Sequence, residues 1–183
     1  FKFYQFIVIS QNFHKYSFFG KIRQRIRLKI LLGNMKKWSE LCPANHQHRL
    51  ALVQAEYSRI SGDGMTAQKF YEDAGRLARK GSFLNDAGLS YEVAGLSYLA
   101  SGQRMIAMAY FKKARYYYQR WGAKAKVKQI ELRYPDLDVN TGEVSTSTTH
   151  STVSASVIDI TTLKKSLVAI AEEKVHSLMI EKI

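Results

Sequence analysis

Apolar and small residues recur three and four positions apart through much of the chain, which is the spacing of one helix face. The pattern is clearest between residues 34 and 135, where alanine is frequent and the only prolines, Pro43 and Pro135, lie near the two ends. Five helices are predicted there: His48–Ser61, Met65–Lys80, Leu84–Ala100, Gln103–Arg120 and Ala123–Tyr134. The chain is therefore expected to be all-α.

The helical region contains an internal repeat with an offset of 40 residues. The matched positions are Ser61-Gly62 and Ser101-Gly102, Ala67 and Ala107, Tyr71 and Phe111, and Ala74 and Ala114. In each copy a helix ends at Gly, and the next helix carries a small, an aromatic and a small residue on one face. This predicts a stack of antiparallel helix pairs of the tetratricopeptide kind, with a period longer than the roughly 34 residues usual for that fold. Since about three repeats are usually needed for stability, the segment is expected to need contacts with something outside the chain.

Three other regions differ in composition. Residues 1–33 begin with an aromatic run typical of a strand and continue as a basic helix, KIRQRIRLKILL, in which Ile22, Ile26 and Ile30 recur every four residues. Residues 136–156 are rich in Ser and Thr and predict a flexible linker. Residues 157–183 predict an amphipathic helix.

The C-terminal segment carries Leu163, Leu167 and Ile170 at the spacing of a coiled-coil seam. The next seam position is Lys174, so the seam ends there or shifts by one residue. The pattern predicts a docking helix or a homodimer through this segment. A plain surface helix of a following domain fits it as well.

Bulk composition sets broad limits on the protein class. Of 183 residues, 46% are hydrophobic, which is too many for wholesale disorder, and no uncharged run is long enough to cross a bilayer. One cysteine excludes an internal disulfide framework and fits a reducing compartment. No targeting segment is recognised, so the cytoplasm is the expected location. The first residue is Phe rather than Met, which favours a fragment or a processed chain.

The net charge of +13 is concentrated in two clusters. Residues 1–40 hold nine Lys or Arg residues and a single acid, Glu40. Residues 102–129 hold eight Lys or Arg residues and no acid. Such clusters suit nucleic acid, anionic lipid or an acidic protein, and do not choose among them.

The segment 116–129, YYYQRWGAKAKVKQ, combines aromatic and basic side chains and holds the candidate interaction residues Arg120, Trp121, Lys124 and Lys128. A nucleic-acid surface would use the rings for stacking and the cations for phosphates. However, successive residues on a helix point about 100° apart, so the rings cannot all share one face. Tyr117 continues the stripe of Ala107, Phe111 and Ala114 and is predicted to be core. We therefore expect the aromatics to pack between helices and the lysines to be solvated, which makes nucleic acid the less favoured ligand.

The chain contains no phosphate-binding Gly-rich loop, kinase motif or nucleophile elbow, so no catalytic or cofactor-binding residue is predicted. Cys42, His46 and His48 lie close in sequence, but their spacing matches no common zinc pattern. Pro43 instead marks a helix start, with the histidines as polar residues near its first turn. Glu172-Glu173 is predicted to be a solvated pair.

Two stretches resemble the helical region of very large hybrid signalling kinases. They are MKKWSELCPANHQHRLALVQAEYSRISGD (35–63) and the stretch from AQKFYEDAG to RWGAKAKVKQIELRYP (67–135). The segment IDITTLKKSLVAIAEE (158–173) resembles the helix that leads into the GAF domain of the same family. The resemblance implies a parent protein that joins a serine/threonine kinase, an AAA-type ATPase, a tetratricopeptide-like region, a GAF sensor and a C-terminal histidine kinase. Residues 1–20 match nothing recognised in the family, and no catalytic residue of the family can be placed on this chain.

The resulting expectation is a non-catalytic scaffold or signal-relay segment of a multidomain, ATP-using signalling kinase. Its expected partners are other domains of the same polypeptide, namely the ATPase and the GAF sensor, while ATP would bind elsewhere in the parent protein. The alternative is a stand-alone basic adaptor that binds an acidic protein or RNA.

Overall fold

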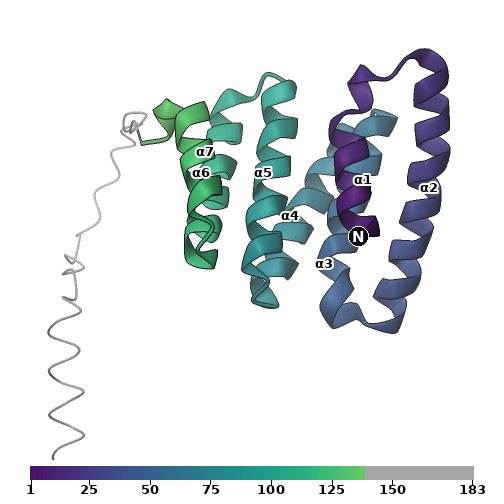
Figure 1. Ribbon diagram of the computed structural model, residues 1–183, viewed down its shortest axis with the longest axis horizontal. Coiled ribbons are helices and arrows are strands. Elements are labelled where there is room, and N and C mark those ends of the chain that lie inside the picture. The colour runs from purple at the N-terminus through teal and green to yellow at the C-terminus, as the bar shows by residue number, and fades with distance from the viewer. Residues whose placement is uncertain (139–183) are drawn as a thin grey trace, which may run out of the picture. The chain divides into compact units, whose positions relative to one another are not determined.

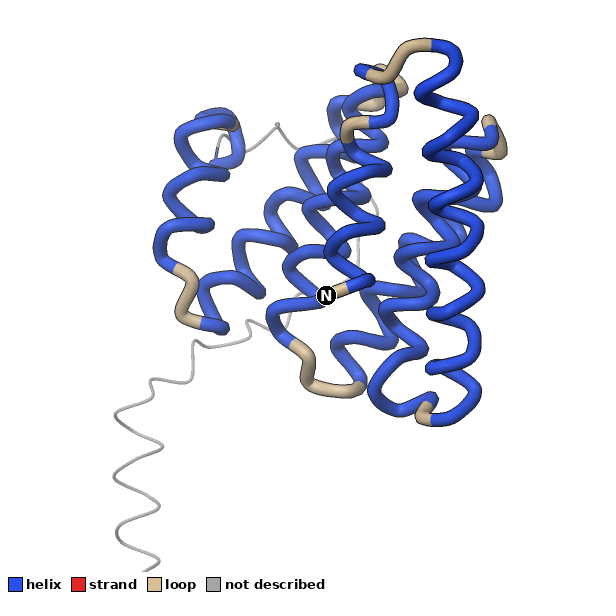
Figure 2. Tube along the Cα trace, turned by 45° about the vertical axis from the view of Figure 1, so that its right-hand side comes forward, coloured by secondary structure: helices blue, strands red, loops and turns tan. Residues whose placement is uncertain are grey.

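A computed structural model describes residues 1–138, which belong to one compact unit. The described residues contain helices and connecting loops and no strand (Figures 1 and 2). The α-helices are α1 Lys2–Gln11, α2 Phe18–Leu41, α3 Pro43–Ser61, α4 Gly64–Lys80, α5 Leu84–Ala100, α6 Arg104–Trp121 and α7 Lys124–Arg133. Two short 3₁₀ helices, η1 Phe13–Lys15 and η2 Pro135–Asp138, accompany them. The all-α prediction is confirmed, and α5 has the predicted bounds.

The helices stack as antiparallel pairs. The most extensive contacts join α3 to α4 and α5 to α6, and α4 packs in turn on α5 (Figure 1). The repeated residues of both copies are buried between these helices: Ala67, Tyr71 and Ala74 on α4, and Ala107, Phe111 and Ala114 on α6. The small–aromatic–small face predicted from the repeat therefore forms the core of the stack.

Glycine ends the first helix of each repeat. Gly62 and Gly102 have φ angles of +86° and +78°, a left-handed conformation that costs glycine little because it has no Cβ. After Gly62, the Asp63 side chain accepts a hydrogen bond from the Thr66 backbone N–H at 3.1 Å and caps α4. Hydrogen bonds from the Thr66 side chain and from this backbone N–H lower the pKa of Asp63. The turns between the helices are thus specified locally.

Glycines inside the helices receive aromatic rings from the neighbouring helix. A Cβ added to Gly88 on α5 would lie 2.7 Å from the Tyr118 ring, and one added to Gly75 on α4 would lie 2.7 Å from the Tyr91 ring. Real Cβ atoms do not come that close to ring carbons. The missing side chains therefore let the helix backbones approach each other more closely than alanine would.

The N-terminal region differs from its prediction. Residues 2–11 form a helix and not a strand, because Phe3, Phe6, Ile7 and Ser10 fall on one helical face that is buried against α2 and α3. The basic helix is also longer than expected: α2 begins at Phe18 and continues to Leu41, across the boundary drawn at residue 33. Residues 1–33 are therefore part of the stack.

The C-terminal boundary also shifts. Residues 136–138, assigned to the linker by composition, form the end of η2, and the Leu137 side chain there is buried. The rest of the predicted linker and the helix predicted at 157–183 lie outside the described residues. Among residues 1–138, no helix combines the length and apolar character needed to cross a membrane.

Candidate functional site

The predicted interaction residues lie at the corner between α6 and α7. Helix α6 ends at Trp121, Gly122 turns the chain with φ +83°, and α7 begins at Lys124. Arg120, Trp121, Lys124 and Lys128 are all exposed. The structure therefore places the four residues on the surface of one corner, which we call the α6–α7 corner.

The rings at this corner only partly follow the prediction. Trp121 and Tyr116 are 54% and 51% exposed, so the expectation that these aromatics pack between helices is wrong for both. The Arg120 guanidinium lies 5.8 Å from the centre of the Tyr116 ring, one helical turn away. A cation held over an exposed ring, beside an exposed indole, is a surface suited to recognition of another protein.

The core tyrosine is Tyr118 and not Tyr117. Tyr118 is buried and donates a hydrogen bond to Glu92 Oε2 on α5 at 2.6 Å. Burial raises the pKa of Tyr118, and the Glu92 carboxylate raises it further. Tyr117 is half-buried and stacks on Tyr91, with ring centres 5.6 Å apart. Residues 117 and 118 lie three and four positions after Ala114, so spacing alone could not separate them.

The lysines of α7 divide into two groups. Lys126 turns toward α5, where its Nζ donates to Glu92 Oε1 at 2.8 Å, and it lies 5.4 Å from the centre of the Tyr118 ring. Lys124 and Lys128 are exposed and, being four residues apart, lie on the same side of α7. The prediction that all three are solvated therefore holds only in part for Lys126, whose side chain is 37% exposed but whose Nζ joins α7 to α5.

Much of the second basic cluster is engaged within the chain. Arg104 Nη2 lies 2.6 Å from Asp136 Oδ2, and Arg115 Nη1 lies 3.6 Å from Glu131 Oε1. Lys113 Nζ lies 5.2 Å from the centre of the Tyr110 ring. These contacts break up the row of cations that a phosphate backbone would need. The other predicted contact residues, Leu163, Leu167 and Ile170, lie outside the described residues.

His48 occupies a different environment from the one predicted. Its side chain is buried, and its Nε2 lies 2.8 Å from Asp86 Oδ2, 38 residues away on α5. An ionised carboxylate can only accept, so the Nε2 carries the proton. Arg49 Nε donates to the same Oδ2 at 2.7 Å, and the His48 ring stacks on Phe83 with centres 4.4 Å apart. The helix begins at Pro43 as predicted, but His48 lies buried in its second turn and is not a first-turn polar residue.

Asp86 is a buried carboxylate stabilised by two donors. Burial alone would raise its pKa, but the hydrogen bonds from His48 and Arg49 outweigh burial and hold the pKa below the ordinary value. The three side chains join the start of α3 to the start of α5, and Cys42 lies half-buried nearby in sequence. Within residues 1–138, no three His, Cys, Asp or Glu side chains are grouped so as to hold a metal ion.

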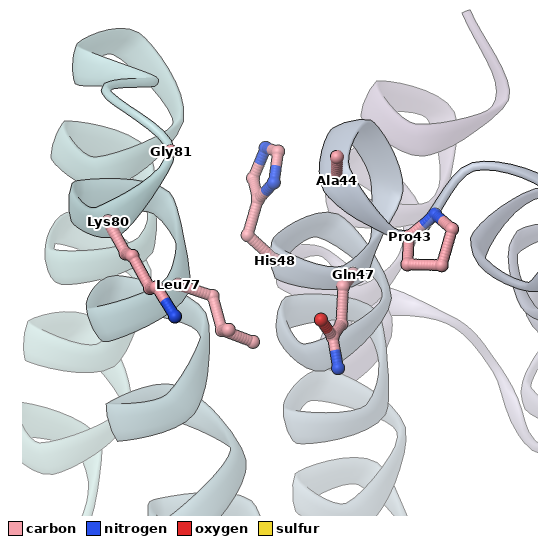
Figure 3. A pocket seen from close by; sticks show the side chains of 7 residues that line it. All are labelled: Pro43, Ala44, Gln47, His48, Leu77, Lys80 and Gly81. Atoms are coloured by element: carbon pink, nitrogen blue, oxygen red, sulfur yellow. The ribbon is translucent and has the colours of Figure 1, made fainter.

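A hollow of about 290 Å³ lies beside His48, between the start of α3 and the end of α4. Its lining residues are Pro43, Ala44, Gln47, His48, Leu77, Lys80 and Gly81. Figure 3 shows Leu77 and Lys80 reaching from α4 toward the helix that carries Gln47 and His48. A His–Asp pair can act as a general base, but this lining contains no hydroxyl or thiol for it to activate.

A second buried carboxylate joins the N-terminal helix to the repeats. Glu56 on α3 is 0% exposed and accepts hydrogen bonds from Gln11 Nε2 at 2.8 Å, from Arg59 Nε at 2.9 Å and from the Tyr71 hydroxyl. Arg59 Nη2 also donates to the Ser10 carbonyl at 2.9 Å. Burial raises the pKa of Tyr71, and Glu56 reinforces the shift.

Sequence reasoning missed these carboxylates and the ring-accepting glycines. A pairing such as His48 with Asp86 leaves no periodic signal, because it depends on how two helices meet. The glycines did leave one: GLSY occurs at 88–91 and again at 95–98, which places Gly88 and Gly95 two turns apart on one face of α5.

Comparisons with known proteins place the chain in no established group. No family model, no curated protein and no solved structure matches it.

Proposed function

We propose that the chain is a non-catalytic helical scaffold that holds together domains of a multidomain ATP-dependent signalling kinase of the serine/threonine kinase, ATPase and sensor histidine kinase type. The resemblance of residues 35–135 and 158–173 to that family supports the choice of parent protein. The observation that carries the scaffold role is the α6–α7 corner, where Trp121 and Arg120 stand exposed beside Lys124 and Lys128. Its partners are the ATPase and GAF domains of the same polypeptide, and ATP binds elsewhere in the parent.

The chemistry of the corner favours a protein ligand. Trp, Tyr and Arg dominate the residues whose truncation weakens protein interfaces, because they bury large areas at low entropic cost. Trp121 leaves about half of its surface for a partner, and Arg120 is already oriented by Tyr116. Lys124 and Lys128 lie on the rim, where charges steer association more than they add affinity.

The test has two parts. The genomic DNA on either side of this reading frame should encode the kinase and ATPase upstream, and the GAF domain and histidine kinase downstream. Each flanking domain is then expressed and titrated calorimetrically against the 183-residue chain. Trp121→Ala should weaken the binding of one of them by about tenfold or more, while Met105→Ala, at an exposed position at the other end of α6, should not.

Each part of the test can contradict a different part of the proposal. Flanking DNA that encodes no kinase would remove the parent protein from the proposal. Equal affinities for the Trp121→Ala and Met105→Ala chains would remove the α6–α7 corner as the contact site.

The alternative function is a basic adaptor that binds RNA, and salt dependence discriminates it. Single-stranded RNA bound through phosphates should dissociate steeply as salt rises, and charge reversal of Lys112, Lys113, Lys124 and Lys128 should abolish the binding. Because Arg104, Lys113, Arg115 and Lys126 already have partners in the fold, we expect RNA to bind this cluster only weakly even at low salt.

A further inference from the structure

Helix α2 is apolar on two opposite sides. Its inner side buries Leu28, Leu31 and Met35 against the stack. On the outer side Ile22, Ile26 and Ile30 are 46%, 60% and 62% exposed. Leu28 follows Ile26 by two positions, which is about 200° around the helix, so the two apolar rows face away from each other. Such a helix is expected to be covered on both sides.

The outer row has the form of a helix-packing ridge. Ile22, Ile26 and Ile30 are spaced by four residues, so successive side chains are about 6 Å apart along the axis. Rows with this spacing fit into the groove between the matching rows of another helix. The exposed rings of Phe18 and Phe19, whose centres are 5.6 Å apart, extend the row toward the start of α2. We call residues 18, 19, 22, 26 and 30 the α2 ridge.

Cations flank the α2 ridge on both sides. Arg23 and Arg27 each follow a ridge isoleucine by one position, and Lys29 precedes one, which places them about 100° to either side. All three are exposed. Residues 1–39 contain no acid that could neutralise them from within the N-terminal region.

We propose that the α2 ridge is a docking face for an amphipathic helix of a partner protein whose apolar row is flanked by Asp or Glu. The apolar row would bury the isoleucines, and the acids would pair with Arg23, Arg27 and Lys29. This face is distinct from the α6–α7 corner, which lies at the other end of the stack from α2 (Figure 1).

The charge and shape of the α2 ridge favour an acidic partner helix over a second copy of the chain and over a lipid surface. A second copy of the chain would bring the same cations against each other, which opposes self-association through this face. A lipid surface is best bound by a helix with one broad apolar face, whereas the outer apolar side of α2 is a single row along most of its length. An amphipathic helix with acidic flanks can both cover the exposed isoleucines and pair with the cations beside them.

The test uses two synthetic probes and the whole chain. One probe is an amphipathic helix of about 20 residues with a leucine row flanked by glutamates, and the other carries lysines in place of the glutamates. Fluorescence anisotropy should show binding of the acidic probe alone, weakening as salt rises. Ile26→Asp should weaken it by about tenfold or more, as should Arg23→Glu combined with Arg27→Glu. Leu132→Asp, at an exposed apolar position on α7, should leave the affinity unchanged.

Circular dichroism of each variant checks that the fold is retained, since the altered side chains are exposed. The proposal is overturned if the acidic probe does not bind, or if the acidic and basic probes bind equally. Sedimentation that shows a dimer dissolved by Ile26→Asp would assign the ridge to a second copy instead. Binding to phosphatidylglycerol vesicles that Ile26→Asp abolishes, without binding of the acidic probe, would assign it to lipid.

Discussion

The Phe111 ring of α6 lies directly against the backbone of Gly95 on α5, so that a Cβ at residue 95 would be 2.7 Å from the ring carbon Cε1. Phe111 is fully buried and stacks on Tyr134, with ring centres 4.0 Å apart, so it has little room to move. Gly95→Ala should therefore destabilise the protein by about 1–3 kcal/mol, although alanine is the better helix former. Urea unfolding followed by circular dichroism measures the change.

Gly33 provides the matched control. It lies inside α2, and a Cβ there would meet nothing within 4 Å. Gly33→Ala should stabilise the protein by about 0.5–1 kcal/mol through helix propensity. Equal effects of the two substitutions would show that the α5–α6 approach is not as close as described.

Loss of the buried carboxylate at residue 86 should be among the most damaging changes to this chain. Asp86→Ala leaves the buried His48 and the partly exposed Arg49 without their acceptor, for a predicted cost of about 1–3 kcal/mol at neutral pH. Asp73→Ala removes an acid from the exposed pair with Arg76 and should cost less than about 1 kcal/mol. Comparable losses in the two variants would contradict the structural role of Asp86.

The contribution of Asp86 should depend on pH in a defined direction. Because its pKa is lower in the folded protein than in the unfolded chain, its stabilisation is complete above the unfolded value of about 4. It is lost as the pH falls through the folded pKa. The stability difference between wild type and Asp86→Ala should thus be largest above about pH 4 and should shrink in more acid solution. A difference that grows on acidification would argue against a favoured carboxylate.

Alkaline titration should separate the tyrosines into two classes. Burial raises the pKa of Tyr71, Tyr91, Tyr110, Tyr118 and Tyr134, out of 11 tyrosines in the chain. A raised folded pKa contributes stability below the unfolded value of about 10, and this contribution is lost as the pH rises toward the folded pKa. Near pH 10 the native protein should therefore show less phenolate absorbance than the chain in guanidinium. Superimposable titration curves would refute the burial of these rings.

Removal of Glu92 should loosen α7 before it affects the rest of the stack. Glu92 accepts hydrogen bonds from Tyr118 and Lys126, which join α5 to α6 and to α7. In Glu92→Ala, amide hydrogen exchange should accelerate in α7 while α3 and α4 keep their protection. Glu72→Ala, at an exposed position on α4, serves as the control. Unchanged exchange in α7 would show that apolar packing alone holds it.

The residue pattern predicted the fold correctly in the two repeats, where equivalent positions have the same environment. The offset that relates Tyr71 to Phe111 placed both rings in the core, because each lies between small residues on a single face. The pattern failed where composition and periodicity disagree. Residues 2–11 have the aromatic composition of a strand, but the spacing of Phe3, Phe6 and Ile7 is helical, and packing decided the outcome.

The candidate site was predictable only in part. Arg120, Trp121, Lys124 and Lys128 stand together because a single turn at Gly122 joins their helices. The contact that engages Lys126 could not be predicted, since it depends on Glu92, 34 residues away on another helix. The exposure of Trp121 likewise depends on where α6 ends, which periodicity places only to within a residue or two.

The hydrogen bonds around Glu56 set the register of α1 on the repeats. The Gln11 amide and the Ser10 carbonyl both bind the Glu56–Arg59 pair, and these bonds are directional. If α1 slid by one turn, about 5.4 Å, its apolar face would still meet apolar side chains, but Glu56 and Arg59 would lose these partners. Apolar contacts therefore hold α1 on the stack without fixing its position along the helix axis. The directional hydrogen bonds of Glu56 and Arg59 fix that position.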